Sequence, residues 1–169
     1  YEFIINRKGI EKPSVKYPEG YVYDYGKDIT VEISPESNGF TKDGDVTVTD
    51  AGDYTLILTL KDNFVWSDGT FDQLKLQWKV VQRQISLPTL SAKQLTYTGK
   101  TQTVTVNGVD GKAVTLDVSA SADGASLDGT TLSVLHAGSY TVTATLKNEN
   151  FVWADGYKGL VLNVAQATN

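Results

Sequence analysis

Apolar and polar residues alternate along several short stretches of the chain, the pattern of a β-strand with one face in a core and the other in solvent. The clearest stretches are 54–60, 74–80, 104–106, 114–118 and 140–146. Tyr54 and three leucines share one face of the first stretch, while Thr55, Ile57 and Thr59 share the other. No stretch keeps a helical period. We therefore expect an all-β protein whose antiparallel strands have one wet side.

Turn signals separate these stretches. Asp-Gly or Asn-Gly pairs occur at 43–44, 107–108, 110–111, 123–124 and 128–129. Such pairs favour tight hairpin turns because glycine readily adopts a positive φ. Short strands at this spacing indicate a small sandwich or barrel.

The chain contains an internal repeat. Residues 51–69 align with 137–156 after one insertion near Glu149, and 13 of the 19 positions in the first copy are identical. The match extends outward, with Ile10 and Pro13 pairing with Ile85 and Pro88. We expect one module over residues 1–82 and a second over residues 83–169, each of a normal size for a sandwich.

The first residues have their own place in the repeat. Residues 1–5 align with 76–80, at the end of the first copy. We therefore interpret residues 1–8 as the last strand of a preceding copy, or a strand that replaces it. Since methionine is absent even at position 1, we interpret the chain as a segment of a longer tandem array.

Three motifs carry a resemblance to a known family. They are Ala-Gly-x-Tyr-Thr at 51–55 and 137–141, Phe-x-Trp-x-Asp-Gly at 64–69 and 151–156, and Tyr-Thr-Gly-Lys-x-Gln-x-Val at 97–104. Together they resemble Ig-like tandem repeats of bacterial cell-surface proteins. The resemblance implies two tandem Ig-like β-sandwiches, in which Tyr54 and Tyr140 form tyrosine corners. Some similar repeats are β-grasp-like modules, and that fold remains the alternative.

Composition excludes several functions. The net charge of −5 disfavours nucleic acid as a partner. Cysteine is absent, so neither a disulfide nor a thiolate metal site can form. No apolar run reaches the length that spans a membrane, and we expect no membrane insertion by this segment.

The aromatic residues are the main candidates for a role in structure or binding. Phe64, Trp66, Phe151 and Trp153 recur in both copies, which favours a shared structural task in the core over a sugar-stacking platform. A cluster of tyrosines around 18–20 belongs to the first copy alone, and the second copy shows no counterpart to it. These residues are candidates for a specific contact: Tyr17, Tyr21, Tyr23 and Tyr25.

Catalytic and metal-binding chemistry finds little support. The only histidine, His136, precedes an Ala-Gly turn, and we interpret it as an exposed turn residue. The acidic turns at 43–45, 68–69, 123–124 and 155–156 lack the spacing of a calcium loop, so we expect no metal and no cofactor. An internal isopeptide bond from Lys93 or Lys100 to Asn163 is disfavoured, because the first copy has Lys79 at the asparagine position.

The sequence therefore favours a protein that is not an enzyme. We expect a monomeric, extracellular spacer, stalk or adhesion segment of a larger bacterial cell-surface protein. The alternative is a carbohydrate- or protein-binding module of an adhesin or of a surface glycan-processing protein, with a host or cell-wall glycan or protein as its partner. A third, weaker alternative is an accessory domain of an enzyme.

Overall fold

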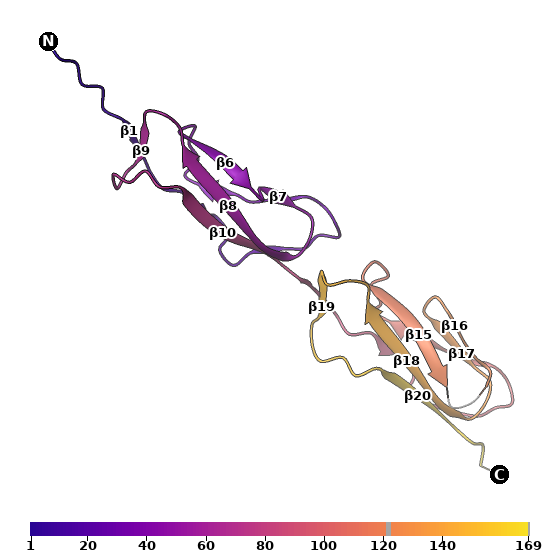
Figure 1. Cartoon of the computed structure of the whole chain (residues 1–169). Helices are drawn as coiled ribbons and strands as arrows, with labels where there is room; N and C mark the ends of the chain where they lie inside the picture. Colours follow the sequence, from indigo (N-terminus) through magenta and orange to yellow (C-terminus); the bar gives the residue numbers. More distant parts are fainter. Residues whose placement is uncertain (121–122, 169) are drawn as a thin grey trace. The chain divides into compact units, whose positions relative to one another are not determined.

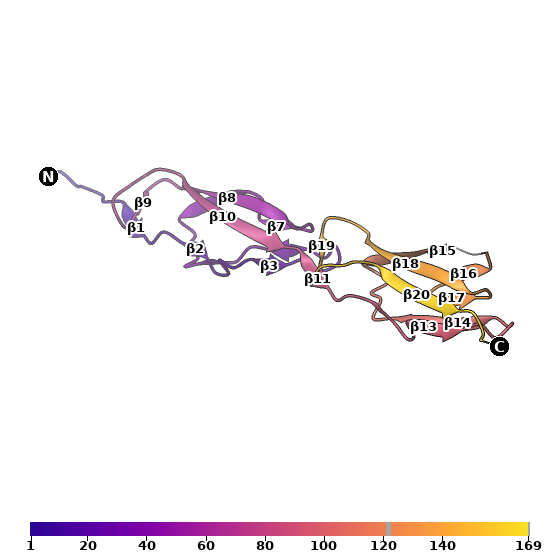
Figure 2. The same cartoon turned by 90° about the horizontal axis from the view of Figure 1, so that it is seen from below.

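The computed structural model describes residues 1–120 and 123–168, and this part of the chain contains strands, turns and no helix (Figures 1 and 2). It divides into two compact units, Tyr1–Arg83 and Gln84–Asn169. We call them the first and second modules. Because none of the described residues is helical, none belongs to a helix that could cross a membrane.

One sheet of the second module contains the strand that begins with the Ala-Gly-x-Tyr-Thr motif. Its order is β13-β20-β18-β15, formed by Gln94–Thr96, Leu160–Ala165, Gly138–Leu146 and Val114–Ala120. β13 runs parallel to β20, whereas β18 is antiparallel to both of its neighbours. The apolar side chains of β18 alternate as the sequence predicts, with Tyr140, Val142 and Ala144 buried.

The other sheet of the second module has the order β12-β14-β17-β16, formed by Thr89–Leu90, Gln102–Asn107, Thr131–Val134 and Ala125–Asp128. All of its pairs are antiparallel. β16 and β17 form a tight hairpin in which Asp128 pairs with Thr131 and Gly129 has a φ of 57°. This is one of the Asp-Gly turns expected from the sequence.

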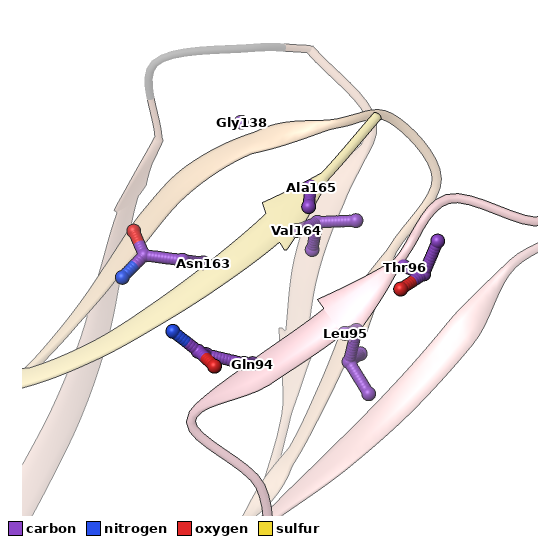
Figure 3. Close-up of a pocket in the computed structure, with 7 residues that line it drawn as sticks. All are labelled: Gln94, Leu95, Thr96, Gly138, Asn163, Val164 and Ala165. Atoms are coloured by element: carbon purple, nitrogen blue, oxygen red, sulfur yellow. The ribbon is translucent and has the colours of Figure 1, made fainter. Parts of the chain in front are cut away.

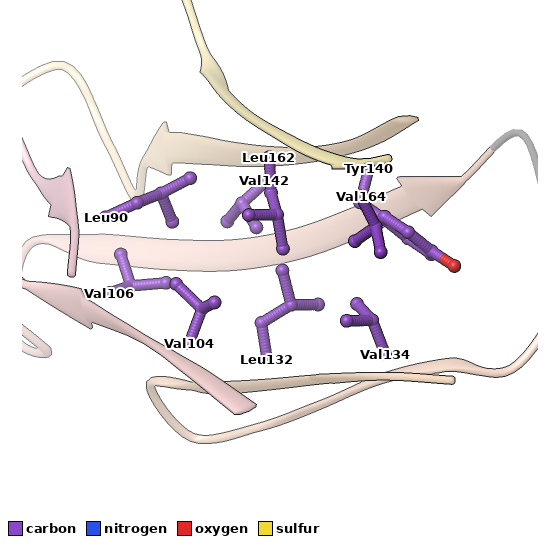
Figure 4. Close-up of a cluster of buried hydrophobic side chains, with 9 residues drawn as sticks. All are labelled: Leu90, Val104, Val106, Leu132, Val134, Tyr140, Val142, Leu162 and Val164. Atoms are coloured by element: carbon purple, nitrogen blue, oxygen red, sulfur yellow. The ribbon is translucent and has the colours of Figure 1, made fainter. Parts of the chain in front are cut away.

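The core of the second module lies between these two sheets (Figure 4). Side chains from opposite sheets face each other in the close-up, with the Tyr140 hydroxyl at the edge of the cluster. The cluster consists of Leu90, Val104, Val106, Leu132, Val134, Tyr140, Val142, Leu162 and Val164. Each strand contributes alternate residues, because successive side chains of a strand point to opposite faces.

The first module repeats this strand order. One sheet has the order β3-β10-β8-β6, formed by Tyr21–Val22, Leu74–Val81, Gly52–Leu60 and Phe40–Gly44. The opposite layer contains two short pairs, β2 (Ser14–Val15) with β5 (Ile33–Ser34) and β4 (Ile29–Thr30) with β7 (Thr47–Val48). β4 and β5 take the place of the continuous β14. The described part of the first module has no counterpart of β16.

These registers define the fold class as two Ig-like β-sandwiches. An Ig sandwich has strands A, B, E and D in one sheet and C, F and G in the other. In the second module, β12, β14, β17 and β16 occupy the A, B, E and D positions, while β15, β18 and β20 occupy C, F and G. A β-grasp module would place a helix against its sheet, and the described chain has none. The Ig-like expectation is therefore confirmed.

Each module also has a short two-stranded pair, and the pair of the first module is parallel. β1 (Lys8–Ile10) lies beside β9 (Phe64–Trp66), and β11 (Arg83–Ile85) lies beside β19 (Phe151–Trp153). In the first module, the Ser67 N–H donates to the Ile10 carbonyl over 2.7 Å. In the second, the Ala154 N–H donates to the Ile85 carbonyl over 2.9 Å. The two pairs are therefore equivalent, and Ile10 corresponds to Ile85 in space as it does in sequence.

The two motif tyrosines bond back to the loop before their strand. The Tyr140 hydroxyl donates to the His136 carbonyl over 2.7 Å, and the Tyr54 hydroxyl donates to the Asp50 carbonyl over 2.8 Å. Their burial differs, because Tyr140 is fully buried while Tyr54 is only partly buried. Buried Trp78 lies beside Tyr54, with ring centroids 5.1 Å apart, and takes the core position that Leu162 has beside Tyr140.

Tyr157 has a structural role that the sequence did not reveal. Its hydroxyl accepts a 2.6 Å hydrogen bond from the Ala144 N–H and donates a 3.3 Å bond to the Val142 carbonyl. Strand pairing between β18 and β20 ends where Val142 faces Leu160. The hydroxyl therefore replaces backbone pairing before the start of β20. A side chain that bonds to a neighbouring strand gives no periodic signal, so pattern analysis had no means of finding it.

Candidate functional site

A row of four aromatic rings crosses one sheet of the first module. Tyr17 lies edge-on to Tyr21 with centroids 5.3 Å apart, and Tyr21 lies edge-on to Trp78 at 5.7 Å. Tyr54 continues the row on the other side of Trp78 at 5.1 Å. Strands β3, β10 and β8 supply three of the rings, and the loop between β2 and β3 supplies Tyr17. Sheet pairing thus aligns residues that are distant in sequence.

Polar contacts fix the outer end of this row. The Tyr21 hydroxyl accepts a 2.7 Å hydrogen bond from the Glu32 N–H. Lys16 forms a 2.6 Å ion pair with Glu32, and its ammonium lies 5.3 Å from the centroid of the Tyr17 ring. The hydrogen bond to Glu32 is the main reason that the pKa of Lys16 is raised. Tyr17 is the most exposed of the four rings, at 44%.

A shallow groove of about 340 Å³ lies over β8 and β10, on the face of the sheet opposite the buried Trp78 ring. Its lining includes Pro18, Asp53, Gln77, Trp78 and Lys79. Trp78 is only 4% exposed, and its indole N–H already donates to the Asp45 carbonyl over 2.8 Å. The groove therefore offers a polar rim of a carboxylate, an amide and an ammonium group, and Pro18, the sequence neighbour of the exposed Tyr17, is part of its lining. The groove can form hydrogen bonds, and the exposed Tyr17 ring can stack on an apolar face.

The four candidate tyrosines do not form one surface. Tyr23 is 6% exposed and belongs to the core, so it is unavailable as a contact residue. Tyr25 adopts a positive φ of 51° and lies under the Arg83 guanidinium, 4.7 Å from its ring centroid. Only Tyr17 and Tyr21 contribute to the aromatic row. One part of the cluster thus stabilises the end of the module, and the other forms the candidate binding surface.

The second module has a counterpart of Tyr23, contrary to our expectation. The Tyr23 N–H donates to the Val81 carbonyl over 3.0 Å, and the Tyr97 N–H donates to the Ala165 carbonyl over 2.8 Å. Both tyrosines thus follow the early strand that runs parallel to the last one. Tyr97 is 36% exposed, whereas Tyr23 lies beside Tyr25 with ring centroids 6.3 Å apart. The second module has one residue fewer than the first between this tyrosine and the following Gly-Lys pair, so aligning the two Gly-Lys pairs does not align the tyrosines.

The Phe-Val-Trp motif places its rings differently in the two modules. In the first, Trp66 is fully buried and its indole N–H donates to the Asp72 carbonyl over 2.9 Å, while Phe64 is half-buried.

In the second module the burial is reversed, since Phe151 is buried and Trp153 is half-buried. Trp153 stacks on Tyr157 with centroids 4.9 Å apart. In the first module Phe40 lies 6.0 Å from Trp66, whereas the residue in the register of Phe40 is the smaller Val114 in the second. The neighbouring aromatic residue therefore differs between the modules, and so does the ring of the Phe-Val-Trp motif that is buried.

A second groove, of about 480 Å³, follows the parallel pair β13 and β20 (Figure 3). Gln94 and Asn163 face each other in the register of this pair and direct their amides to the same side. Lys93, Lys100 and Asn163 are all exposed. An isopeptide bond needs a lysine with a lowered pKa, which burial would supply. These residues therefore lack the buried setting that such a bond requires.

The acidic turns and the histidine have ordinary structural contacts. Asp68 binds Lys12 over 2.6 Å and accepts a 2.6 Å bond from the Thr70 hydroxyl, and these bonds lower the pKa of its carboxyl group. His136 is exposed. Across residues 1–120 and 123–168, no three His, Cys, Asp or Glu side chains are placed to hold a metal ion.

Comparison with known proteins identifies no family. No protein-family model matches the chain, and no curated protein matches it either. Solved structures that it resembles include two tandem Ig domains of titin, with 15% identity, a TM-score of 0.32, and coverage of 93% of this chain and 97% of that one.

Two further solved structures come from an S-layer protein and from a protein of a glucan utilization locus. Domains 4 and 5 of the S-layer protein SbsC show 14% identity and a TM-score of 0.34, over 82% of this chain and 83% of that one. The SGBP-B protein of a Bacteroides ovatus mixed-linkage glucan utilization locus, solved with a heptasaccharide, shows 16% identity and a TM-score of 0.24, over 96% of this chain and 47% of that one. At these values none assigns a function, and the Ig-like class rests on the chain's own strand order.

Proposed function

We propose that this chain is a non-catalytic structural segment, a spacer or an adhesion segment of a bacterial cell-surface protein, and that it holds its two Ig-like modules in restricted relative motion. The observation that carries this proposal is the join. β10 ends at Val81 and β11 begins at Arg83, so one residue, Gln82, separates the last strand of one module from the first strand of the next. A join of this length cannot act as a flexible coil.

Hydrogen bonds anchor the join on the side of the first module. The Val81 carbonyl accepts from the Tyr23 N–H, and the Arg83 side chain donates to the Tyr23 carbonyl over 2.9 Å. Arg83 also contacts Asp24 over 3.1 Å and covers Tyr25. Asp24 is held further by Lys27, whose hydrogen bond is the largest cause of the lowered pKa of its carboxyl group. Part of the tyrosine cluster thus fixes the end of β10.

On the other side, the chain is anchored within the second module. Ile85 is 4% exposed, and its carbonyl accepts the bond from Ala154. Only Gln84 stands between the anchored Arg83 and the anchored Ile85. Few backbone dihedrals are left free, which supports a stiff link. Such a link suits a segment that presents other parts of a surface protein at a set distance.

Backbone relaxation of the two modules tests this proposal. In the intact chain we expect ¹⁵N relaxation to give the two modules a common rotational correlation time. Insertion of Gly-Ser-Gly-Ser-Gly after Gln82 should give two separate, shorter values, and Arg83→Gln should shift them in the same direction. Arg7→Gln is the matched control, because Arg7 lies over Phe71 and away from the join. Independent tumbling of the modules in the parent chain would refute the proposal.

The second candidate function is binding of a carbohydrate by the aromatic row of the first module. The observation that favours it is the exposed Tyr17 ring, whose sequence neighbour Pro18 lines a groove with a polar rim. Sugars present apolar ring faces and hydroxyl groups, and both kinds of surface are available here.

A glycan array followed by titration calorimetry with the oligosaccharides it selects tests this second function. Tyr17→Ala should weaken binding at least about tenfold, which corresponds to about 1.4 kcal/mol. Tyr97→Ala, which removes an exposed tyrosine from the second module, should leave the affinity unchanged. Equal effects of the two variants, or no glycan bound by the parent, would reject the aromatic row as a sugar site.

A further inference from the structure

The first residues of the chain form an apolar segment that belongs to no strand of the first module. Residues 1–7 form no strand, although Tyr1, Phe3, Ile4 and Ile5 are large apolar residues. Their exposures are 120%, 90%, 80% and 90%. A run of exposed apolar residues marks an interaction surface more often than a solvated end. Its partner can be identified from the equivalence of the two modules.

The equivalence of the two modules aligns this segment with β10. Lys8–Ile10 and Arg83–Ile85 are equivalent strands, since each lies beside the Phe-Val-Trp strand of its own module. Immediately before Arg83 the chain forms β10, the last strand of the preceding module, with Gln82 between them. The same offset assigns residues 1–6 to the positions of 76–81. The segment therefore occupies, along the chain, the place of a last strand.

Its side chains fit that role residue by residue. Phe3 and Ile5 take the positions of Trp78 and Val80, which are 4% and 3% exposed in the core. Ile4 takes the position of Lys79, which faces solvent. The alternation thus predicts that Phe3 and Ile5 point inward and that Ile4 points outward.

Neither module can accept this strand. In a module of this kind the last strand pairs with two other strands. In the first module, β10 is antiparallel to β8 and parallel to β3. That slot is filled by β10 in the first module and by β20 in the second. An acceptor must therefore be another module whose sheet lacks its own last strand. Its unpaired backbone groups would bind the segment by strand addition.

We propose that residues 1–6 are a donor strand that completes a further Ig-like module of the same repeat type, inserted between its β8-like and β3-like strands. Phe3 then faces the tyrosine of that module's Ala-Gly-x-Tyr-Thr strand, as Trp78 faces Tyr54. Ile5 faces the glycine two residues before that tyrosine, as Val80 faces Gly52. Strand addition gives the segment backbone partners on both sides and covers its inward residues.

An extended chain tests the proposal. Residues 8–75 are placed directly before Tyr1 of the full chain, so that an acceptor without β10 precedes the donor strand. A control chain places residues 8–82 directly before Lys8, so that the added module keeps its own β10. Hydrogen exchange of the amides is then measured by mass spectrometry, with the parent chain as reference.

In the parent chain, the amides of residues 2–6 should exchange at the rate of an unstructured peptide. In the extended chain, their exchange and that of the added module should be slower by on the order of 100-fold or more, as in a folded module. Ile4→Lys should retain this protection, whereas Phe3→Lys or Ile5→Lys should abolish it. Protection of the added module in the control chain but not in the extended chain would overturn the proposal. So would equal losses from Ile4→Lys and Phe3→Lys.

Discussion

Replacement of Tyr140 by Phe isolates one hydrogen bond that links a strand to the loop before it. The hydroxyl donates to the His136 carbonyl over 2.7 Å, and the side chain is 0% exposed. Phenylalanine keeps the ring, so the contacts of Tyr140 with the buried cluster of the second module remain. The variant therefore reports the loss of the hydroxyl with little change in packing.

The expected cost is that of a net intramolecular hydrogen bond, about 1 kcal/mol. For a domain of this size, such a loss lowers the melting temperature by about 4–8 °C. With a urea m-value of about 1–3 kcal/mol/M, the unfolding midpoint falls by roughly 0.3–1 M.

Because the chain has two modules, the assay must follow each one. Hydrogen exchange across a urea series, read by mass spectrometry, assigns a midpoint to peptides of each module. Tyr54→Phe is the matched control. Its hydroxyl makes the same bond in a more exposed setting, where water can replace it, so we expect a loss within about 0.5 kcal/mol, confined to the first module.

Two results would refute this reasoning. The first is an unchanged midpoint of the second module in Tyr140→Phe, which would mean that the bond contributes nothing net. The second is a loss in Tyr54→Phe as large as that in Tyr140→Phe, which would mean that burial does not set the cost.

Three other outcomes are expected. Tyr157→Phe should lower the midpoint of the second module at least as much as Tyr140→Phe, because it leaves the Ala144 N–H without its partner; a smaller loss in the same urea series would contradict this. Asp68→Asn should flatten the acid dependence of the melting temperature of the first module. The lowered pKa means that ionised Asp68 stabilises the fold above its unfolded pKa of about 3.9, and that this contribution is lost as the pH falls below it. Equal slopes for parent and variant between pH 6 and 2.5 would count against the role of the Lys12–Asp68 pair. Finally, EDTA should leave both melting temperatures unchanged, and a fall of several degrees that calcium reverses would restore the acidic turns as a metal site.

For the tyrosine cluster, the sequence pattern identified the residues but not the contacts that each of them makes. Uniqueness to one copy singled out Tyr17, Tyr21, Tyr23 and Tyr25 together. The structure divides them, since Tyr23 belongs to the core and Tyr25 lies under Arg83, while Tyr17 and Tyr21 join Trp78. These partners are distant in sequence, so no local pattern could assign them.

The all-β class, the repeat, and the motif tyrosines with their strands could be predicted from the amino-acid sequence alone. Period-2 alternation follows directly from strand geometry, and hydrophobic burial selects the inward face, so both can be read without knowledge of the neighbours. An identical Ala-Gly-x-Tyr-Thr motif likewise leads to the same bond in both modules, because donor and acceptor are only four residues apart.

The features that depend on packing between strands became visible in the folded structure. It determined which ring of each Phe-Val-Trp motif is covered, and it showed the role of Tyr157 before the start of β20. It also showed the additional strand β16 in the second module. In each case the outcome depends on the side chains and backbone groups that strand pairing brings together, and these lie far apart along the chain.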